Sequence, residues 1–369
     1  MNQLFRWDQM GLFLLALAAG ILPFAVPEVC AAALREGLTL CCGPLLLSLF
    51  PFLVVSRLLI QCPESDLLAL PFRLAAWGIG IRTPCAARVL CIGFLGGFAP
   101  AASAVAQAVR TGQLTAEEAD ALLPACICSG PSFVVLTVGQ SLLGSAELGV
   151  LLFASQITAN YLTAALLNRF AGVRSVKLGS AAPASPAPPR LDEILADAAI
   201  TYCKLCGFIL FFRMLAAGAG ALLPAGAGTL CSILLEVCSG CDLASRTGRW
   251  GSLLCCAALS VQGLSVLLQV RTICPPEMTL RPLYRSRLLH LPLSLALFYL
   301  LLPGGEADVF STLPARVLLM RRVPPDCALL VFAVCCMAAC TLRSGIRQVE
   351  QKQMARNAGG CCINSKTLL

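Results

Sequence analysis

Two neighbouring apolar stretches between residues 93 and 135 constrain the fold most, because residues that break helices interrupt each of them near its middle. The first stretch reads GFLGGFAPAASAVAQAVR and the second ALLPACICSGPSFVV. The breaking residues are Gly96, Gly97 and Pro100 in the first, and Gly130 and Pro131 in the second. Irregular backbone in lipid leaves N–H and C=O groups unpaired, so it persists only where protein or a water-filled cavity covers it. The pattern therefore predicts a buried site built from broken helices, as in many transporters.

The composition indicates a membrane protein. Hydrophobic residues make up 58% of the chain and charged residues only 12%, whereas soluble domains carry about 25% charge. The net charge of +8 comes from short loops and the tail, which fits anchoring on the cytoplasmic side better than binding of nucleic acid. We therefore expect an all-α polytopic membrane protein in contact with a lipid bilayer.

Apolar runs predict the helices. We expect them at about residues 10–26, 31–60, 86–109, 119–140, 148–168, 194–223, 250–272, 288–302 and 324–342. The first is expected to be an uncleaved helix rather than a signal peptide, because the residues before it are not basic. Two further apolar pieces, 67–80 and 229–240, are too short to cross a bilayer. Thr115 and Glu118 predict a capping box at a helix start.

The second half of the chain repeats the order of the first. The segment PFLVVSRLL at 51–59 aligns with GFILFFRML at 207–215, and SAVAQAVRT at 103–111 resembles SVLLQVRT at 265–272. Chance similarity between leucine-rich stretches is the alternative, but the shared order of elements favours duplication. The predicted parts are an extra helix at 1–28, a first repeat at 29–170, a Pro/Ala-rich linker at 171–192, a second repeat at 193–343 and a basic tail at 344–369. Because the linker and the tail are basic, we expect both in the cytoplasm, with about nine crossings.

Polar side chains form stripes on three apolar helices. The stripes are Ser103 with Gln107, Gln156 with Asn160, and Gln262 with Ser265 and Gln269, each spaced to share one helix face. Such stripes hold helices together at about 1 kcal/mol per hydrogen bond, or they line a solute site. Where stripes coincide with helix breaks, we favour the site.

Glu236 is the most informative charge, because it lies within the apolar run TLCSILLEVCSG. An acid within the membrane marks a functional site by default, where it orients a solute or carries a cation or a proton. The alternative is that Glu236 pairs with Arg57 or Arg213, or reaches the membrane interface. We expect these two arginines to extend to the lipid headgroups at the outer ends of their helices.

The residues offer little for an enzyme or a metal site. The motifs HExxH, GxSxG and GxxxxGK do not occur, and His290 is the single histidine. The 22 cysteines lie mainly in apolar runs, where cysteine packs as a small hydrophobic residue. Two CxxC pairs, Cys203/Cys206 and Cys238/Cys241, have ligand spacing, but the first lies on a predicted membrane helix with no histidine nearby. We expect no catalysis, no metal and no cofactor, so that any transport is secondary, facilitated or driven by another subunit.

Six motifs, taken in order, carry a resemblance to a known family. They are LFPFLVVSRLL (49–59), GGFAPAASA (96–104), CSGPSFVVLTVG (128–139), QITANYL (156–162), LLEVCSG (234–240) and LSVQGLSVLLQV (259–270). Together they resemble the nucleoside-recognition (Gate) domain family, in its sporulation integral membrane protein branch of the YlbJ type. The resemblance implies a duplicated, multi-pass protein of the cell membrane of an endospore-forming bacterium, acting in spore cortex formation. The chain departs from the family at Ser103, where the family has a basic residue, and at Gln156 and Leu267 or Leu268, where it has histidines. Roles of those side chains are therefore not carried over.

Two functions follow as hypotheses. The first is a secondary transporter or channel for a small polar, nucleoside-like solute used in sporulation; the alternative is a non-transporting membrane scaffold for spore-envelope assembly. The expected partners are lipid, the solute, other sporulation membrane proteins and further copies of the chain. The residues expected to bind solute are Ser129, Gly130, Ser132, Glu236, Ser239, Gln262, Ser265, Gln107, Gln156 and Asn160. Those expected to break helices are Gly96, Gly97, Pro100, Pro131, Gly240 and Gly263.

Overall fold

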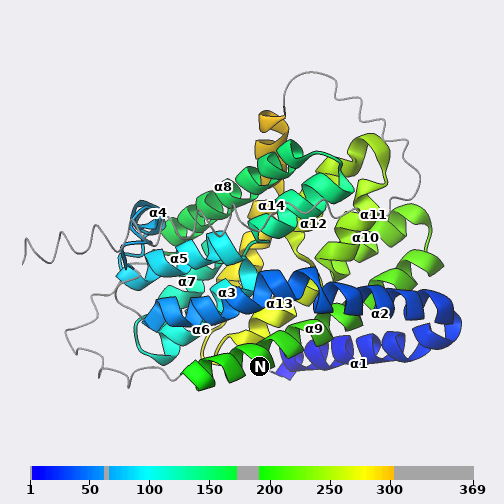
Figure 1. Ribbon diagram of the computed structural model, residues 1–369, viewed down its shortest axis with the longest axis horizontal. Helices are drawn as coiled ribbons and strands as arrows, with labels where there is room; N and C mark the ends of the chain where they lie inside the picture. The colour runs from blue at the N-terminus through cyan, green and yellow to red at the C-terminus, as the bar shows by residue number, and fades with distance from the viewer. Residues whose placement is uncertain (1, 62–65, 173–190, 303–369) are drawn as a thin grey trace, which may run out of the picture. The chain divides into compact units, whose positions relative to one another are not determined.

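The computed structural model describes residues 2–61, 66–172 and 191–302, and this part of the chain is all-helical (Figure 1). It contains fourteen α-helices, a π-helix and a 3-10 helix, η3 (Gly248–Trp250). The predicted linker at 171–192 falls almost wholly outside the described residues. The span expected at 324–342 and the basic tail at 344–369 lie entirely outside them.

The N-terminal region contains more helix boundaries than expected. Helices α1 (Asn2–Ala25) and α2 (Pro27–Cys42) meet at a bend of 110°, and α3 (Pro44–Gln61) starts directly after Gly43. The segment expected as one helix over 31–60 is thus two. Proline stands at the first position of both α2 and α3, where its missing N–H costs nothing and its fixed φ suits a helix start. Pro51 lies inside α3, and α4 (Phe72–Gly78) is the short piece expected at 67–80.

Four helices are interrupted in the middle. The pairs of half-helices are α5 (Pro84–Gly96) with α6 (Phe98–Arg110), α7 (Ala116–Cys126) with the π-helix η2 (Ser132–Leu142), α10 (Ala225–Leu235) with α11 (Val237–Ser245), and α12 (Gly251–Val261) with α13 (Gly263–Ile273). The third pair replaces the single short piece expected at 229–240. Its interruption lies at Glu236 and not at Gly240, which is inside α11.

Three helices run without interruption through the rest of the described chain. They are α8 (Ala146–Ala171), α9 (Leu191–Leu222) and α14 (Arg281–Leu301). Ser145 caps α8 by accepting from the Leu148 N–H, and Gly172 ends it in a left-handed conformation. The capping box of Thr115 and Glu118 is confirmed at the start of α7. Helix α14 begins at Arg281, earlier than the expected residue 288.

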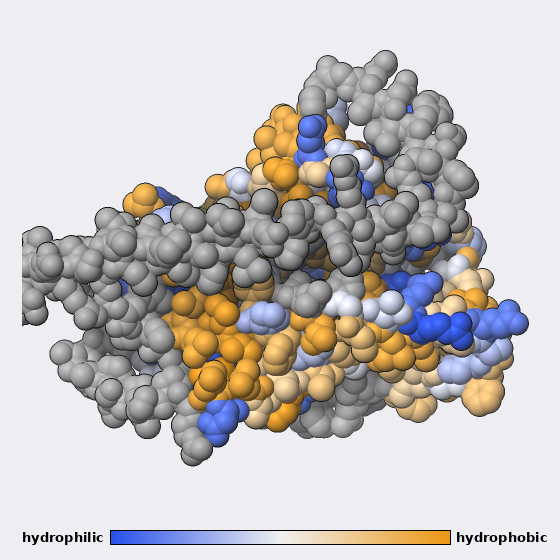
Figure 2. Space-filling model, in the orientation of Figure 1, coloured by the Kyte–Doolittle hydropathy of each residue, from blue (hydrophilic) through white to orange (hydrophobic). Residues whose placement is uncertain are grey.

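Several described helices suit a membrane. By length and apolarity, Ala146–Ala171, Leu191–Leu222 and Gly248–Ile273 can each cross a bilayer, and the bent pair Phe13–Ala25 with Pro27–Cys42 adds a fourth if it forms one span. Large apolar side chains are exposed on these helices, such as Phe24, Phe170 and Ile200. Apolar residues make up much of the coloured part of the surface in Figure 2. The figure of about nine crossings remains a prediction.

One large apolar core joins α5–α8 to α10–α14. Helix α2 packs along α9 in a smaller cluster around Cys30 and Phe212 (Figure 1). The described cysteines are unpaired, and most are buried. The prediction that Arg57 and Arg213 extend to lipid headgroups stays a prediction, but each side chain pairs with an exposed acid on a neighbouring helix. Arg57 on α3 forms an ion pair with Asp197 on α9, and Arg213 on α9 forms one with Glu36 on α2.

Candidate functional site

The first two interruptions meet through glycine. Gly97 has φ +82° and ψ −164°, and a Cβ atom placed on it would lie 2.6 Å from the backbone nitrogen of Gly130. A Cβ atom on Gly130 would in turn lie 3.3 Å from the carbonyl oxygen of Gly96. Two backbones can approach this closely only where side chains are absent.

The other two interruptions meet in the same way. Gly263 has φ +71°, and a Cβ atom there would lie 2.9 Å from the backbone nitrogen of Glu236. Beside it, Gln262 has φ 63°, which is a left-handed conformation that costs a residue other than glycine about 1–2 kcal/mol. This strain persists at the junction of α12 and α13 because the surrounding contacts impose it.

A side chain joins the two pairs of interruptions. The Gln262 Nε2 donates to the carbonyl oxygen of Ile127 at 3.1 Å, across from α12 to the end of α7. All four interruptions therefore gather in one place, which we call the break cluster: Gly97 and residues 127–130, 235–236 and 262–263. This contact brings the interruptions near residues 130 and 262 together.

Glu236 serves as the N-cap of α11 inside the break cluster. Its Oε1 accepts from the Cys238 N–H at 2.9 Å and its Oε2 from the Ser239 N–H at 2.7 Å. The side chain is buried at 2% exposure. Arg57 and Arg213 pair with other acids, so the alternative pairing with Glu236 does not occur. The carboxylate is held by backbone N–H groups and the positive end of a helix.

Removing this cap is expected to destabilise the protein. Glu236→Ala leaves two partly buried N–H groups without their acceptor, and losing an N-cap costs about 0.5–2 kcal/mol. Glu236→Gln keeps one acceptor oxygen and should lose about half as much. Unfolding in a denaturing detergent measures both free energies. Equal stability of Glu236→Ala and the unmodified protein would show that the cap contributes nothing.

Arg287 on α14 is a buried cation beside the break cluster, and sequence reasoning missed it. Its guanidinium donates to the carbonyl oxygens of Ile127 and Ser260 at 3.5 Å each and to the Asn160 Oδ1 at 3.4 Å. It contacts no carboxylate among the described residues. Ile127 and Ser260 lie at the C-terminal ends of α7 and α12, so Arg287 places a positive charge where two helix dipoles present negative ends.

Further polar groups surround Arg287. Gln156 on α8 donates to the Ser260 Oγ at 2.9 Å and to the Cys256 carbonyl oxygen at 3.2 Å, and His290 contacts the Gln156 carbonyl oxygen at 3.2 Å. Four buried atoms here have no hydrogen-bond partner: Asn160 Nδ2, Thr163 Oγ1, Gln262 Oε1 and His290 Nδ1. Buried polar atoms without partners are rare in native proteins, so this set of four marks the place as a candidate for binding a polar group. We call Arg287 and these polar residues of α8, α12 and α14 the polar centre.

The structure brings together many of the residues expected to bind solute. Gln156, Asn160 and Gln262 belong to the break cluster or the polar centre, as does Glu236, while Ser239 lies in the first turn of α11. Ser129 and Gly130 are half-buried within the break cluster, but Ser132 is exposed. Ser265 is buried one turn further along α13, where it accepts from the Gln269 Nε2 at 3.0 Å, and Gln107 is half-buried on α6.

The spacing of Arg287, His290 and Ser294 at i, i+3 and i+7 on α14 is the signal that sequence reasoning passed over. This spacing puts all three on one helix face, and the structure buries all three. Comparison with known proteins adds no further residues, because no protein family, no curated protein and no solved structure matches this chain.

Proposed function

We propose that this protein is a membrane transporter or channel for a small polar solute, with its path through the break cluster and the polar centre. The observation that carries the proposal is the group of four buried polar atoms without partners beside four helix interruptions. Interrupted helices supply unpaired backbone groups that recognise polar solutes within a membrane. Asn160, Gln262 and His290 would bind the solute, and Arg287 would orient its electron-rich atoms.

We further propose that the two halves are structural repeats with about nine crossings. The order of elements supports this proposal, since a helix, two interrupted helices and an uninterrupted helix follow one another in each half, as α3, α5–α6, α7–η2 and α8 and again as α9, α10–α11, α12–α13 and α14. Each half then contributes two interrupted helices to the break cluster. The basic linker and tail support a cytoplasmic position for both.

A role in sporulation, in the cell membrane of an endospore-forming bacterium, rests on the resemblance to the Gate family alone. The test is genetic. The chain should restore heat-resistant spores to an endospore former that lacks its own protein of this type, and Asn160→Leu should not. If Asn160→Leu restores heat-resistant spores fully, the polar centre is not needed for a role in sporulation.

Transport is tested with the purified full chain in liposomes. We expect time-dependent uptake of radiolabelled uridine or adenosine, which serve as small polar probes. Asn160→Leu should reduce the uptake about tenfold or more, because losing one hydrogen bond to a charged or polar partner costs about 1.5 kcal/mol. Thr158→Leu on the exposed side of α8 is the matched control and should transport normally. Uptake no faster than in empty liposomes would contradict transport of nucleoside-like solutes.

A non-transporting membrane scaffold is the second candidate. The close backbone contacts of Gly97 with Gly130 and of Gly263 with Glu236 favour it, because they pack the interruptions tightly. In a scaffold the polar stripes hold helices together. Rescue of sporulation by the chain without uptake of any probe would favour this candidate.

A further inference from the structure

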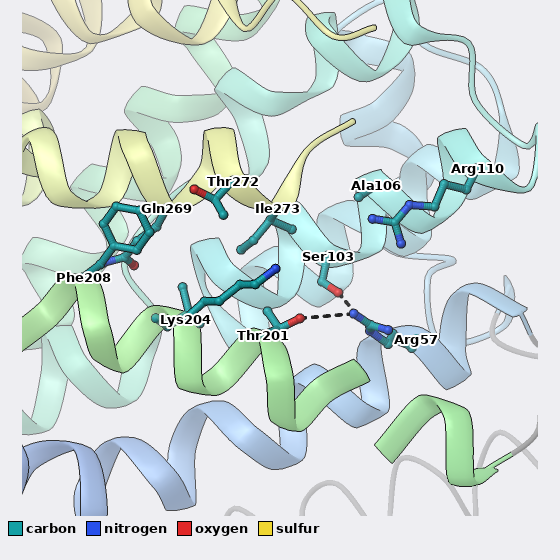
Figure 3. A pocket seen from close by; sticks show the side chains of 11 residues that line it. Arg57, Ser103, Ala106, Arg110, Thr201, Lys204, Phe208, Gln269, Thr272 and Ile273 are labelled. Atoms are coloured by element: carbon teal, nitrogen blue, oxygen red, sulfur yellow. Dashed lines mark hydrogen bonds between the residues drawn. The ribbon is translucent and has the colours of Figure 1, made fainter. Parts of the chain in front are cut away.

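A basic pocket lies between α3, α6, α9 and α13, away from the break cluster. Figure 3 shows its lining side chains, which come from all four helices, with Lys204 extending across the pocket from α9. The cavity has a volume of about 80 Å³. Its lining includes three cations, Arg57, Arg110 and Lys204, and no acid.

The polar contacts in the pocket position Arg57 and leave the other two cations available. Arg57 donates to the Ser103 Oγ and the Thr201 Oγ1 at 3.3 Å each (Figure 3). It also forms an ion pair with Asp197. Among the described residues, Arg110 and Lys204 have no ion pair. One acid therefore stands against three cations, and the pocket has an excess of positive charge.

Gln269 supplies an independent sign of a ligand. Its side chain is buried at 2% exposure and lines the pocket, yet its Oε1 has no hydrogen-bond partner. Its Nε2 is held by the Ser265 Oγ at 3.0 Å, which fixes the amide. A buried acceptor without a partner costs about 1–3 kcal/mol unless a donor reaches it.

We propose that this pocket binds a phosphate group, with the phosphate oxygens held by Arg110 and Lys204 and a phosphate hydroxyl donating to the Gln269 Oε1. Arginine and lysine are the usual partners of phosphate oxygens, and the Arg57 guanidinium adds positive charge at one side. The volume suits one such group with a few waters and is smaller than the 300–1,000 Å³ typical of drug-sized ligands. The phosphate belongs either to a free solute or to the phosphomonoester headgroup of a lipid such as phosphatidic acid, since only these keep a hydroxyl on phosphorus. The proposal does not depend on transport.

The test uses the full chain in nanodiscs of phosphatidylcholine, titrated calorimetrically with inorganic phosphate. Lys204 and Arg110 are exposed, so the double variant Lys204→Gln/Arg110→Gln should fold normally, which its unfolding temperature checks. The charge-matched control is Arg169→Gln/Arg281→Gln, which removes two exposed arginines outside the pocket. We expect the pocket variant to bind phosphate about tenfold or more weakly, since a hydrogen bond to a charged group is worth about 1.5–3 kcal/mol. The control should change little.

A second arm distinguishes the source of the phosphate. If a lipid headgroup is the ligand, phosphatidic acid in the nanodisc should raise the unfolding temperature of the unmodified protein and of the control variant. It should not raise that of the pocket variant, and inorganic phosphate should have no effect on any of the three. Either result supports the proposal and names the source. Equal responses of the pocket variant and the control, to both phosphate and phosphatidic acid, would overturn it.

Discussion

Replacing Gly97 with alanine is expected to destabilise the protein by about 3 kcal/mol or more, through strain and a backbone clash together. The backbone at Gly97, with φ +82° and ψ −164°, is in a region that essentially only glycine adopts. The new methyl group would also lie 2.6 Å from the nitrogen of Gly130, and backbone cannot move away as the end of a flexible side chain can. The loss is measured by unfolding of the purified protein in a denaturing detergent.

Gly112→Ala is the control for this substitution. Gly112 also has a positive φ, +70°, but no atom lies within 4 Å of the position its Cβ would take. Alanine there meets backbone strain alone, at about 1 kcal/mol. If Gly97→Ala and Gly112→Ala lose the same stability, the close contact between the first two interruptions does not exist.

Replacing Arg287 with methionine is expected to leave stability equal or higher while abolishing the proposed solute movement. Burying a guanidinium costs several kcal/mol, and the carbonyl groups at two helix ends stabilise its charge by only up to about 2 kcal/mol. Its hydrogen bonds are long, at 3.3–3.5 Å, and no carboxylate of the described residues compensates its charge. We therefore expect Arg287 to matter more for the proposed solute binding than for stability.

The readouts are the unfolding free energy and uridine or adenosine uptake in liposomes. Arg285→Met on the exposed face of the same helix is the matched control and should change neither. Uptake should be lost only with Arg287→Met. A loss of several kcal/mol of stability in Arg287→Met would instead assign Arg287 to the structure and remove the main reason for placing a solute there.

Apolar runs predicted most helices, because hydrophobic length decides whether a segment crosses a membrane. The predictions failed where a boundary depends on one local residue. Pro44 starts a new helix inside an unbroken apolar run, and Glu236 breaks another run by capping its own following turn. Hydropathy does not distinguish a carboxylate that caps a helix from one that binds an ion.

The site was predicted in part. The glycines at 97 and 263 were found because glycine beside proline or polar residues is unusual in an apolar helix. The partners of these glycines were not, since Gly130 and Glu236 approach them only through the tertiary fold. Arg287 was passed over because it stands beside two exposed arginines near a helix start, where a basic residue ordinarily faces solvent or headgroups.

The central claim, that the interruptions of both halves meet at one buried polar place, is tested most directly by a double-mutant cycle of Gln262→Leu and Arg287→Met. Both side chains donate to the same carbonyl oxygen, that of Ile127. Each single variant leaves one donor, whereas the double variant leaves the oxygen buried without any, at an extra cost of about 1–3 kcal/mol. We therefore predict that the double variant is less stable, by about 1 kcal/mol or more, than the sum of the two single changes in unfolding free energy gives. Losses that add within about 0.5 kcal/mol would show that the two side chains do not share a partner, and would contradict the account.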